Sequence, residues 1–244
     1  MKVRILKEKI VDSTNRIVKE KFLQGETEGF VVVADEQTAG RGRREHEFFS
    51  PAGTGLYMSI LVEPKVDPEK TIYIMPMAAV AVAEAIDEVT ASNDQAKIKW
   101  VNDIYLNGKK TCGILIEGIY STGRSALVVG VGVNIFEPEG GFPDDIKNRA
   151  GAVFSKYVAG KKEMLLNKII EKFSEYYEEY DIEKILDEYR KKSCVIGQRI
   201  DVIDGNSSWS AIAKEIDEKG RLVVENKGGD SVILESEEIS IRVV

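Results

Sequence analysis

The chain has 244 residues, 43% of them hydrophobic and 31% charged, which is the composition of a globular protein and not of a disordered or fibrous one. Its formal net charge of −7, from 34 basic and 41 acidic residues, disfavours general binding to nucleic acids. The two cysteines, Cys112 and Cys194, are too few for a disulfide framework, and the sequence shows neither a signal-peptide core nor a long apolar run. We therefore expect a cytoplasmic protein without a membrane segment.

The hydrophobic pattern of the first 190 residues predicts strands and helices in alternation. Apolar and alternating segments indicate strands at 1–10, 29–36, 55–62, 98–101, 104–106, 111–119 and 126–135. Periodic segments indicate helices after the N-cap candidates Asp12 to Asn15, over 71–89, and over 163–190, as one helix or as two with a break near Asp181. The dipeptide Asn107-Gly108 predicts a hairpin, because both residues tolerate φ > 0.

A change in the hydrophobic pattern near Val195 predicts a second, smaller unit. Beyond it, short apolar segments are separated by the turn sequences Asp204-Gly205-Asn206, Glu218-Lys219-Gly220 and Lys227-Gly228-Gly229-Asp230. This spacing is typical of a small all-β unit. We therefore expect an α+β protein with two domains, 1–194 and 195–244.

An arginine-rich loop, Gly40-Arg41-Gly42-Arg43-Arg44, follows the strand predicted at 29–36. Glycine lets a backbone approach a ligand closely, and arginine offers a planar fork of donors that suits carboxylate and phosphate oxygens. Taken alone, such a run is also compatible with a solvated basic turn. In an acidic protein it concentrates positive charge locally, which suits a small anionic ligand better than a long polyanion.

A second candidate site for anions is Lys99-Trp100-Val101-Asn102-Asp103. Lys99 is either a partly desolvated cation that holds a carboxylate or phosphate, or a surface lysine at a strand end. Asn102 and Asp103 form either a turn, which we favour, or a polar site wall. In Gly130-Val131-Gly132-Val133-Asn134 the glycines either let a ligand lie against the strand, with Asn134 as a polar contact, or relieve crowding.

Several catalytic devices have no counterpart in the sequence. The stretch after Gly130 lacks the third glycine of a dinucleotide fingerprint, and no phosphate-binding P-loop motif occurs. His46, the single histidine, has no obvious acidic partner, and Cys112 lies in an apolar strand, so we expect no covalent catalysis by the enzyme. The cysteines do not form a metal-ligand cluster, and the sequence identifies no protein ligand for a metal ion.

An ordered series of motifs is similar to that of the biotin protein ligases. The motifs are Asp12-Ser13-Thr14-Asn15, Glu36 to Arg44, Ser50-Pro51, Gly55 to Ser59, Lys99 to Asp103 and Gly113 to Glu117. They extend over nearly the whole chain, and their order is far more specific than any one of them. The resemblance implies a catalytic domain with a mixed β-sheet flanked by helices, followed by a small SH3-like β-barrel.

The resemblance also implies an activity. Biotin protein ligases use ATP with Mg²⁺ to convert biotin to biotinyl-5′-adenylate, and then transfer the biotinyl group to one lysine of the biotin carboxyl carrier domain of a carboxylase. The residues that the resemblance assigns to biotin are Ser13, Thr14, Asn15, Gln37, Arg41, Gly42, Arg43 and Lys99. We assign to the nucleotide Arg43, Lys99, Asn102, Asn134, Glu238 and Arg242, with Lys99 and Arg43 as the catalytic pair. For the segment from Glu238 to Arg242, a plain role in a barrel strand is an equal alternative.

Two positions depart from the family pattern, and the alternatives stay open at this stage. Val101 stands where the family often has proline, and Phe48 lies in the region of a family tryptophan. Members that bind DNA carry a helix-turn-helix ahead of the catalytic domain, and Ser13 lies too near the start for one, so we expect no DNA binding. The rival functions are a lipoate-type ligase and a non-catalytic biotin sensor, and a homodimer is one of the open oligomeric states.

Overall fold

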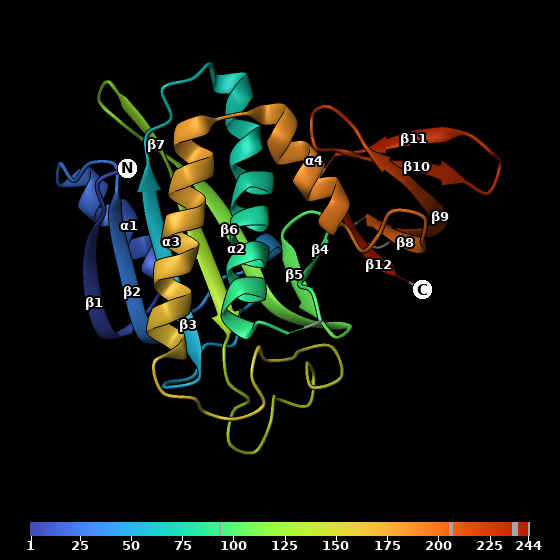
Figure 1. Cartoon of the computed structure of the whole chain (residues 1–244). Coiled ribbons are helices and arrows are strands. Elements are labelled where there is room, and N and C mark those ends of the chain that lie inside the picture. The colour runs from blue at the N-terminus through green and yellow to red at the C-terminus, as the bar shows by residue number, and fades with distance from the viewer. Residues whose placement is uncertain (93, 205–206, 236–238, 244) are drawn as a thin grey trace.

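The computed structural model describes residues 1–92, 94–204, 207–235 and 239–243 (Figure 1). Its first part contains β1 (Arg4–Val11), α1 (Thr14–Leu23), β2 (Phe30–Gln37), β3 (Gly55–Val62), α2 (Ile74–Thr90), β4 (Lys97–Lys99), β5 (Asp103–Leu106), β6 (Lys109–Ser121), β7 (Arg124–Asn134), α3 (Lys161–Glu179) and α4 (Ile182–Lys192). Each strand and helix predicted from the pattern is confirmed, with bounds that differ by a few residues.

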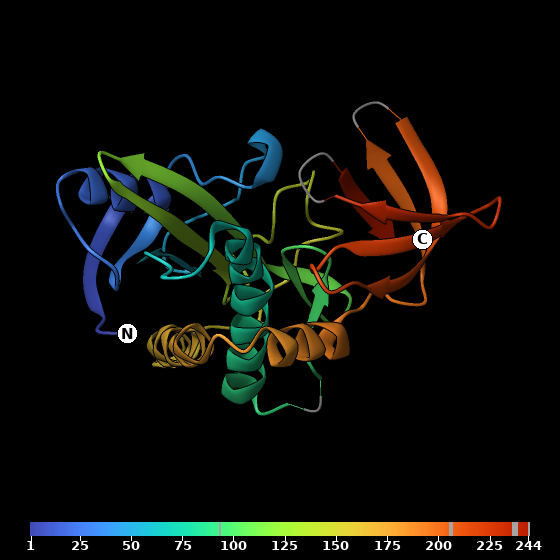
Figure 2. The ribbon, with the colours of Figure 1, turned by 90° about the horizontal axis from the view of Figure 1, so that it is seen from above.

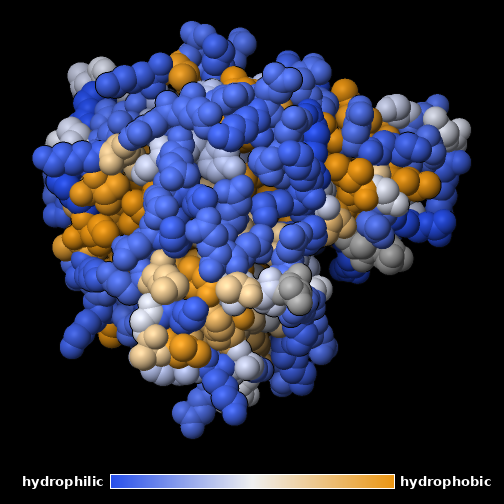
Figure 3. All heavy atoms as spheres, in the orientation of Figure 1, coloured by the Kyte–Doolittle hydropathy of each residue, from blue (hydrophilic) through white to orange (hydrophobic). Residues whose placement is uncertain are grey.

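Seven strands form one mixed sheet in the order β1-β2-β3-β7-β6-β5-β4. The β1–β2 pair is parallel and the other pairs are antiparallel. Helices α2 and α3 cover one face, while α1 packs on the other through Val18 and Phe22 (Figures 1 and 2). The outer surface of α2 and α3 is mainly hydrophilic (Figure 3). The expectation of a mixed sheet flanked by helices is therefore confirmed.

Local sequence signals explain two of the chain reversals. The β5–β6 turn places Asn107 at φ 53° and Gly108 at φ 74°, the left-handed conformations that an Asn-Gly hairpin needs. The long helical segment breaks after Tyr180, which has φ 48°. Asp181 then caps α4, since its side chain accepts a hydrogen bond from the Lys184 backbone N–H. Of the two alternatives, two helices with a break near Asp181 is correct.

The C-terminal strands form a separate antiparallel sheet. They are β8 (Arg199–Asp204), β9 (Ser207–Ile216), β10 (Leu222–Asn226), β11 (Ser231–Leu234) and β12 (Ile239–Val243), in the order β11-β10-β9-β8-β12. The expected small all-β unit is present. Within the described ranges, β11 and β12 lie at opposite edges and no pairing joins them, so the sheet is not a closed barrel.

The turn between β9 and β10 attaches this small sheet to the larger unit. The Trp100 indole N–H donates to the Gly220 carbonyl (3.0 Å), and the Tyr73 hydroxyl donates to the Glu218 carbonyl (2.9 Å). From α4, Arg190 Nε donates to the Ile216 carbonyl at 2.8 Å. These contacts fix the small sheet beside the 99–103 segment.

No described helix has the length and apolarity needed to span a bilayer.

Candidate functional site

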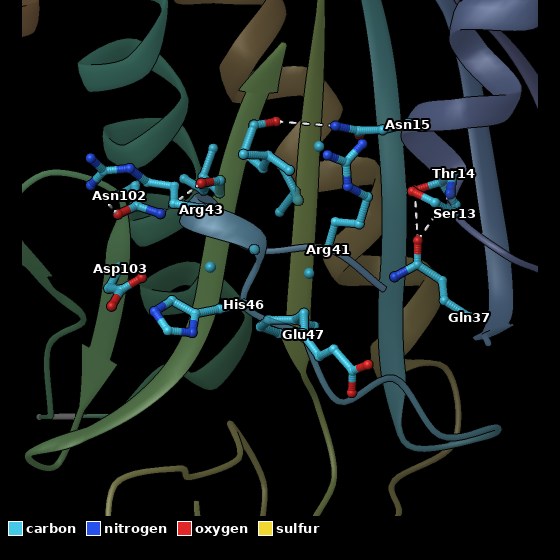
Figure 4. Close-up of a pocket in the computed structure, with 18 of the residues that line it drawn as sticks. Ser13, Thr14, Asn15, Gln37, Arg41, Arg43, His46, Glu47, Asn102 and Asp103 are labelled. Atoms are coloured by element: carbon cyan, nitrogen blue, oxygen red, sulfur yellow. Dashed lines mark hydrogen bonds between the residues drawn. The ribbon is translucent and has the colours of Figure 1, made fainter. Parts of the chain in front are cut away.

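A pocket opens over the middle of β6 and β7, between the first turn of α1 and the arginine-rich loop (Figure 4). Eight of the predicted site residues line it, namely Ser13, Thr14, Asn15, Gln37, Arg41, Gly42, Arg43 and Asn102. They come from segments up to about ninety residues apart in the chain. The pocket has two ends of different chemistry, one neutral and one cationic.

The neutral end is formed by Ser13, Thr14, Asn15 and Gln37, and its side chains are held by hydrogen bonds. The Thr14 backbone N–H and hydroxyl both donate to Gln37 Oε1, at 2.9 and 3.1 Å. Gln37 Nε2 in turn donates to Ser50 Oγ at 3.0 Å. Because the side chains of Thr14 and Gln37 have fixed partners, this end presents donors and acceptors in defined positions.

Asn15 lies on the floor of the neutral end, where small residues leave room for it. A Cβ atom on Gly130 of β7 would come within 2.2 Å of Asn15 Oδ1. Asn15 Oδ1 accepts a hydrogen bond from the Ser59 hydroxyl at 2.6 Å, and Asn15 Nδ2 donates to Glu117 Oε2 at 2.8 Å. Gly130 therefore relieves crowding with the Asn15 side chain, which is the second of the two alternatives that the sequence left open.

The arginine-rich loop folds back on itself over the pocket. The Gly42 N–H donates to the His46 carbonyl at 2.6 Å, and the Phe48 N–H donates to the Gly40 carbonyl at 2.9 Å. Arg44 sits at φ 54° in the turn. A Cβ atom on Gly40 would come within 2.5 Å of both Phe48 O and Ser50 Oγ, so a larger residue would open the loop.

The loop arginines point to different partners. Arg41 Nη1 donates to Glu117 Oε1 at 3.2 Å, whereas Arg43 Nη1 lies 3.5 Å from Asn102 Oδ1. Burial, aided by the charge of Arg44, lowers the pKa of the Arg43 guanidinium, which still remains charged at neutral pH. Arg43 is therefore a partly desolvated cation at the pocket wall.

The cationic end is formed by Arg43 and by the consecutive antiparallel strands β4, β5 and β6, from which Asn102, Asp103 and Lys110 also line the pocket. Asn102 Nδ2 donates to the Ile114 carbonyl at 2.8 Å, and Lys110 Nζ lies 2.6 Å from Asp103 Oδ1. Asn102 is thus part of the site wall as well as of a chain reversal. Lys110 was not anticipated, although the predicted Asn107-Gly108 hairpin places it opposite Tyr105.

Lys99 lies next to the cationic end but not among the residues that line the pocket. It is half-buried on β4, opposite Asp103, and its Nζ lies 5.6 Å from the centre of the Tyr105 ring. Burial lowers the pKa of the Lys99 ammonium, while the Asp103 carboxylate opposes that shift. Lys99 is therefore partly desolvated and not a solvated surface lysine, and its contact with a ligand anion stays a prediction.

The remaining predicted nucleotide residues lie away from the pocket. Asn134 ends β7, and its Nδ2 donates to the Gly151 carbonyl at 3.1 Å. Arg242 is exposed on β12, and its positive charge contributes to the lowered pKa of Lys99. Glu238 lies outside the described residues. The pocket therefore gathers most of the predicted biotin set and only part of the predicted nucleotide set.

Comparison with known proteins assigns the chain to a family. Residues 8–134 match the Biotin/lipoate A/B protein ligase family. The chain is 33% identical over 230 residues to the Bifunctional ligase/repressor BirA of Bacillus subtilis, covering 90% of this chain and 69% of that protein. It is 30% identical over 232 residues to the Biotin--[acetyl-CoA-carboxylase] ligase of Paracoccus denitrificans, covering 91% and 94%.

A solved structure shows the same architecture. The biotin protein ligase from Aquifex aeolicus in complex with biotin and ATP superimposes with a TM-score of 0.82 at 27% identity, over 99% of both chains. The match spans both sheets of the present structure. The chain belongs to the Biotin/lipoate A/B protein ligase family.

Proposed function

We propose that the chain is an ATP-dependent ligase that joins biotin to AMP and then transfers the biotinyl group to a lysine of a biotin carboxyl carrier domain. The supporting observation is the two-ended pocket, because a ureido ring needs neutral donors and acceptors and a carboxylate that meets a phosphate needs cations. Ser13, Thr14, Asn15 and Gln37 bind the ring. Arg41 and Gly42 line the valeryl chain beneath the loop.

In the first step a biotin carboxylate oxygen attacks the α-phosphorus of ATP, and pyrophosphate leaves. Two anions meet, so the reaction is slow unless fixed cations offset the growing charge and hold the atoms in line. Arg43 and Lys99 act on the reacting carboxylate and the α-phosphate. Asn102 lines the pocket beside Arg43, and the assignment of Asn134, Glu238 and Arg242 to the nucleotide stays a prediction from the sequence.

The site is compatible with Mg²⁺ that arrives bound to ATP. Mg²⁺ keeps phosphate and water oxygens as ligands and needs only one or two protein carboxylates. The described part of the chain contains no cluster of three His, Cys, Asp or Glu side chains, but Asp103 supplies a carboxylate in the pocket wall and would hold the ion. When bound, Mg²⁺ neutralises part of the phosphate charge.

In the second step the neutral amine of the acceptor lysine attacks the biotinyl carbonyl, an amide bond forms and AMP leaves. The arginine-rich loop meanwhile keeps water from the mixed anhydride. No enzyme nucleophile is needed, which agrees with the burial of Cys112 and the raised pKa of its thiol.

The organisation around this activity is part of the proposal. Residues 1–194 form the catalytic domain and residues 195–244 a domain related to SH3-like barrels. The protein acts in the cytoplasm without binding DNA, as its acidic charge and cysteine content suggest. Sedimentation of the purified chain distinguishes a homodimer, which is one of the open oligomeric states, from a monomer by its mass.

Pyrophosphate release from the purified chain tests the activity. With biotin and Mg²⁺-ATP, release should be rapid, and lipoate in place of biotin should give little. Addition of a biotin carboxyl carrier domain should then yield a biotinylated lysine, read by mass spectrometry. A preference for lipoate would favour the lipoate-type ligase, and tight biotin binding without pyrophosphate release would favour the sensor.

Arg43→Gly tests the role of the loop. The variant should retain biotinyl-adenylate poorly, so that the reactive intermediate escapes and labels bystander lysines. Labelling of an added unrelated protein measures this escape. Retention and selectivity equal to those of the wild type would contradict the role of Arg43 in holding the intermediate.

A further inference from the structure

The Glu117 carboxylate contacts both the neutral end of the pocket and the arginine-rich loop. It lies on β6, only 16% of its side chain is exposed, and it does not line the pocket itself. Its Oε2 accepts from Asn15 Nδ2 at 2.8 Å, and its Oε1 accepts from Arg41 Nη1 at 3.2 Å and Lys19 Nζ at 2.7 Å. One side chain therefore joins α1, β6 and the arginine-rich loop.

The contact with Asn15 fixes which way its amide faces. An ionised carboxylate only accepts hydrogen bonds, so Glu117 requires the Asn15 NH₂ group, and Ser59 donates to the amide oxygen on the other side. If the amide were reversed, its oxygen would face the carboxylate. Glu117 thus determines which Asn15 atom is left to face the pocket.

The contact with Arg41 anchors the loop at its base. The Arg41 side chain extends from the loop towards Asn15 (Figure 4), and its backbone pairs with Glu47 on the returning arm. The Arg41 charge is therefore paired with the Glu117 carboxylate, which ties the loop to β6.

The charge state of Glu117 agrees with this arrangement. Burial alone would raise the pKa of the carboxyl, but hydrogen bonds from Lys19 and Asn15, and the charges of Lys19 and Arg41, hold it below its ordinary value. The carboxylate is ionised at neutral pH, as its three donors require.

We propose that Glu117 is a positioning residue for biotin activation, which orients Asn15 towards the biotin ring and ties the arginine-rich loop to the sheet through Arg41. This inference rests on the proposed function. It links occupancy of the neutral end to the position of the loop over the reacting atoms.

Glu117→Gln is the direct test, because it keeps the shape of the side chain but turns one acceptor into a donor that opposes Asn15 or Arg41. The KM for biotin should rise about tenfold to a hundredfold, while the KM for ATP changes about twofold or less. Escape of biotinyl-adenylate, read as labelling of a bystander protein, should rise as well. A merely structural role would lower the melting temperature and move both KM values together.

Lys19→Met is the matched control, since it removes one ion pair but leaves the contacts with Asn15 and Arg41. It should leave the biotin KM within about twofold, because the Glu117 carboxylate keeps the hydrogen bonds from Asn15 and Arg41 that carry the proposed role. In a double-mutant cycle, Arg41→Ala should add little escape of the adenylate to that of Glu117→Gln.

The outcomes separate the two claims. If the wild type is active and Glu117→Gln has an unchanged biotin KM, the inference is overturned but the proposed function is not. The same holds if Lys19→Met raises the biotin KM as much as Glu117→Gln does, or if the effects of Glu117→Gln and Arg41→Ala on adenylate escape are strictly additive. A wild type that releases no pyrophosphate with biotin overturns the proposed function and this inference with it.

Discussion

The two ends of the pocket are built in different ways. The neutral end is buried, with Ser13 5%, Thr14 3% and Asn15 4% exposed, and it is held by hydrogen bonds between α1, β2 and β3. The cationic end is more open and depends on charge, through Arg43, Asp103 and Lys110. Shape and hydrogen bonding select the ligand at one end, and charge drives the chemistry at the other.

The two ends also differ in what supports them. The neutral end rests on the central strands β3, β6 and β7 of the large sheet. The cationic end lies at the β5–β4 edge, where Tyr189 of α4 and the β9–β10 turn hold the 99–103 segment. Changes in the central strands should therefore affect biotin recognition, and changes near the edge should affect adenylate formation.

Replacement of Lys99 should give the largest effect. Lys99→Ala removes the desolvated cation that we propose acts on the reacting atoms, and such groups contribute about 100- to 1,000-fold to rate. Pyrophosphate release should fall by that factor while biotin affinity, measured by calorimetry, changes much less. If only transfer to the carrier domain slowed, Lys99 would act in the second step and not in the first.

Two glycines on the same strand allow the ends to be compared directly. Gly130→Ala places a methyl group 2.2 Å from Asn15 Oδ1, so the biotin KM should rise about tenfold to a hundredfold. Gly132→Ala places it 2.6 Å from the Phe48 ring at the other end of the pocket.

Gly132→Ala should therefore mainly affect the nucleotide. Its KM for ATP should rise more than its KM for biotin, the reverse of Gly130→Ala. Steady-state pyrophosphate assays measure both constants. If the two variants changed both constants alike, the division of the pocket into two ends would be wrong. Gly118→Ala on β6, whose Cβ would be no nearer than 3.6 Å to Tyr120, is the control.

Tyr189→Phe tests the support of the cationic end. The buried Tyr189 hydroxyl donates to the Val101 carbonyl at 2.8 Å, and its loss leaves that carbonyl unpaired. The free energy of unfolding should fall by about 1–3 kcal/mol. Pyrophosphate release should fall several-fold with an unchanged biotin affinity. A weakened biotin affinity with normal release would assign Tyr189 to the wrong end.

The smallest effect should be on pH dependence. Burial lowers the pKa of Lys99 from its ordinary value of 10.5, and the role that we propose for Lys99 requires the protonated ammonium. Adenylate formation should thus decline as pH rises through this lowered pKa, before an ordinary lysine would lose its proton. Lys99→Arg, which stays protonated, should move that decline to higher pH. If the rate of adenylate formation declined at the same alkaline pH in the wild type and in Lys99→Arg, another titrating group would cause the decline.

Local patterns predicted the strands and helices, whereas the resemblance to a known family indicated the residues of the neutral end. The Asn107-Gly108 hairpin, the helix break near Asp181 and the strand at 55–62 follow from signals within a few residues. Ser13, Thr14, Asn15 and Gln37 were found because they belong to motifs shared with a known family. Lys110 and Glu117 were not assigned roles, because each acts through partners on other segments.

The amino-acid sequence by itself determined where strands and helices form and which loop carries the arginines, because periodicity, turn residues and glycines act locally. Only the tertiary structure decided that β7 lies between β3 and β6, and that Glu117 meets Asn15 and Arg41 across 102 and 76 residues of chain. Such contacts depend on how the sheet is ordered in space, and no local pattern encodes that order.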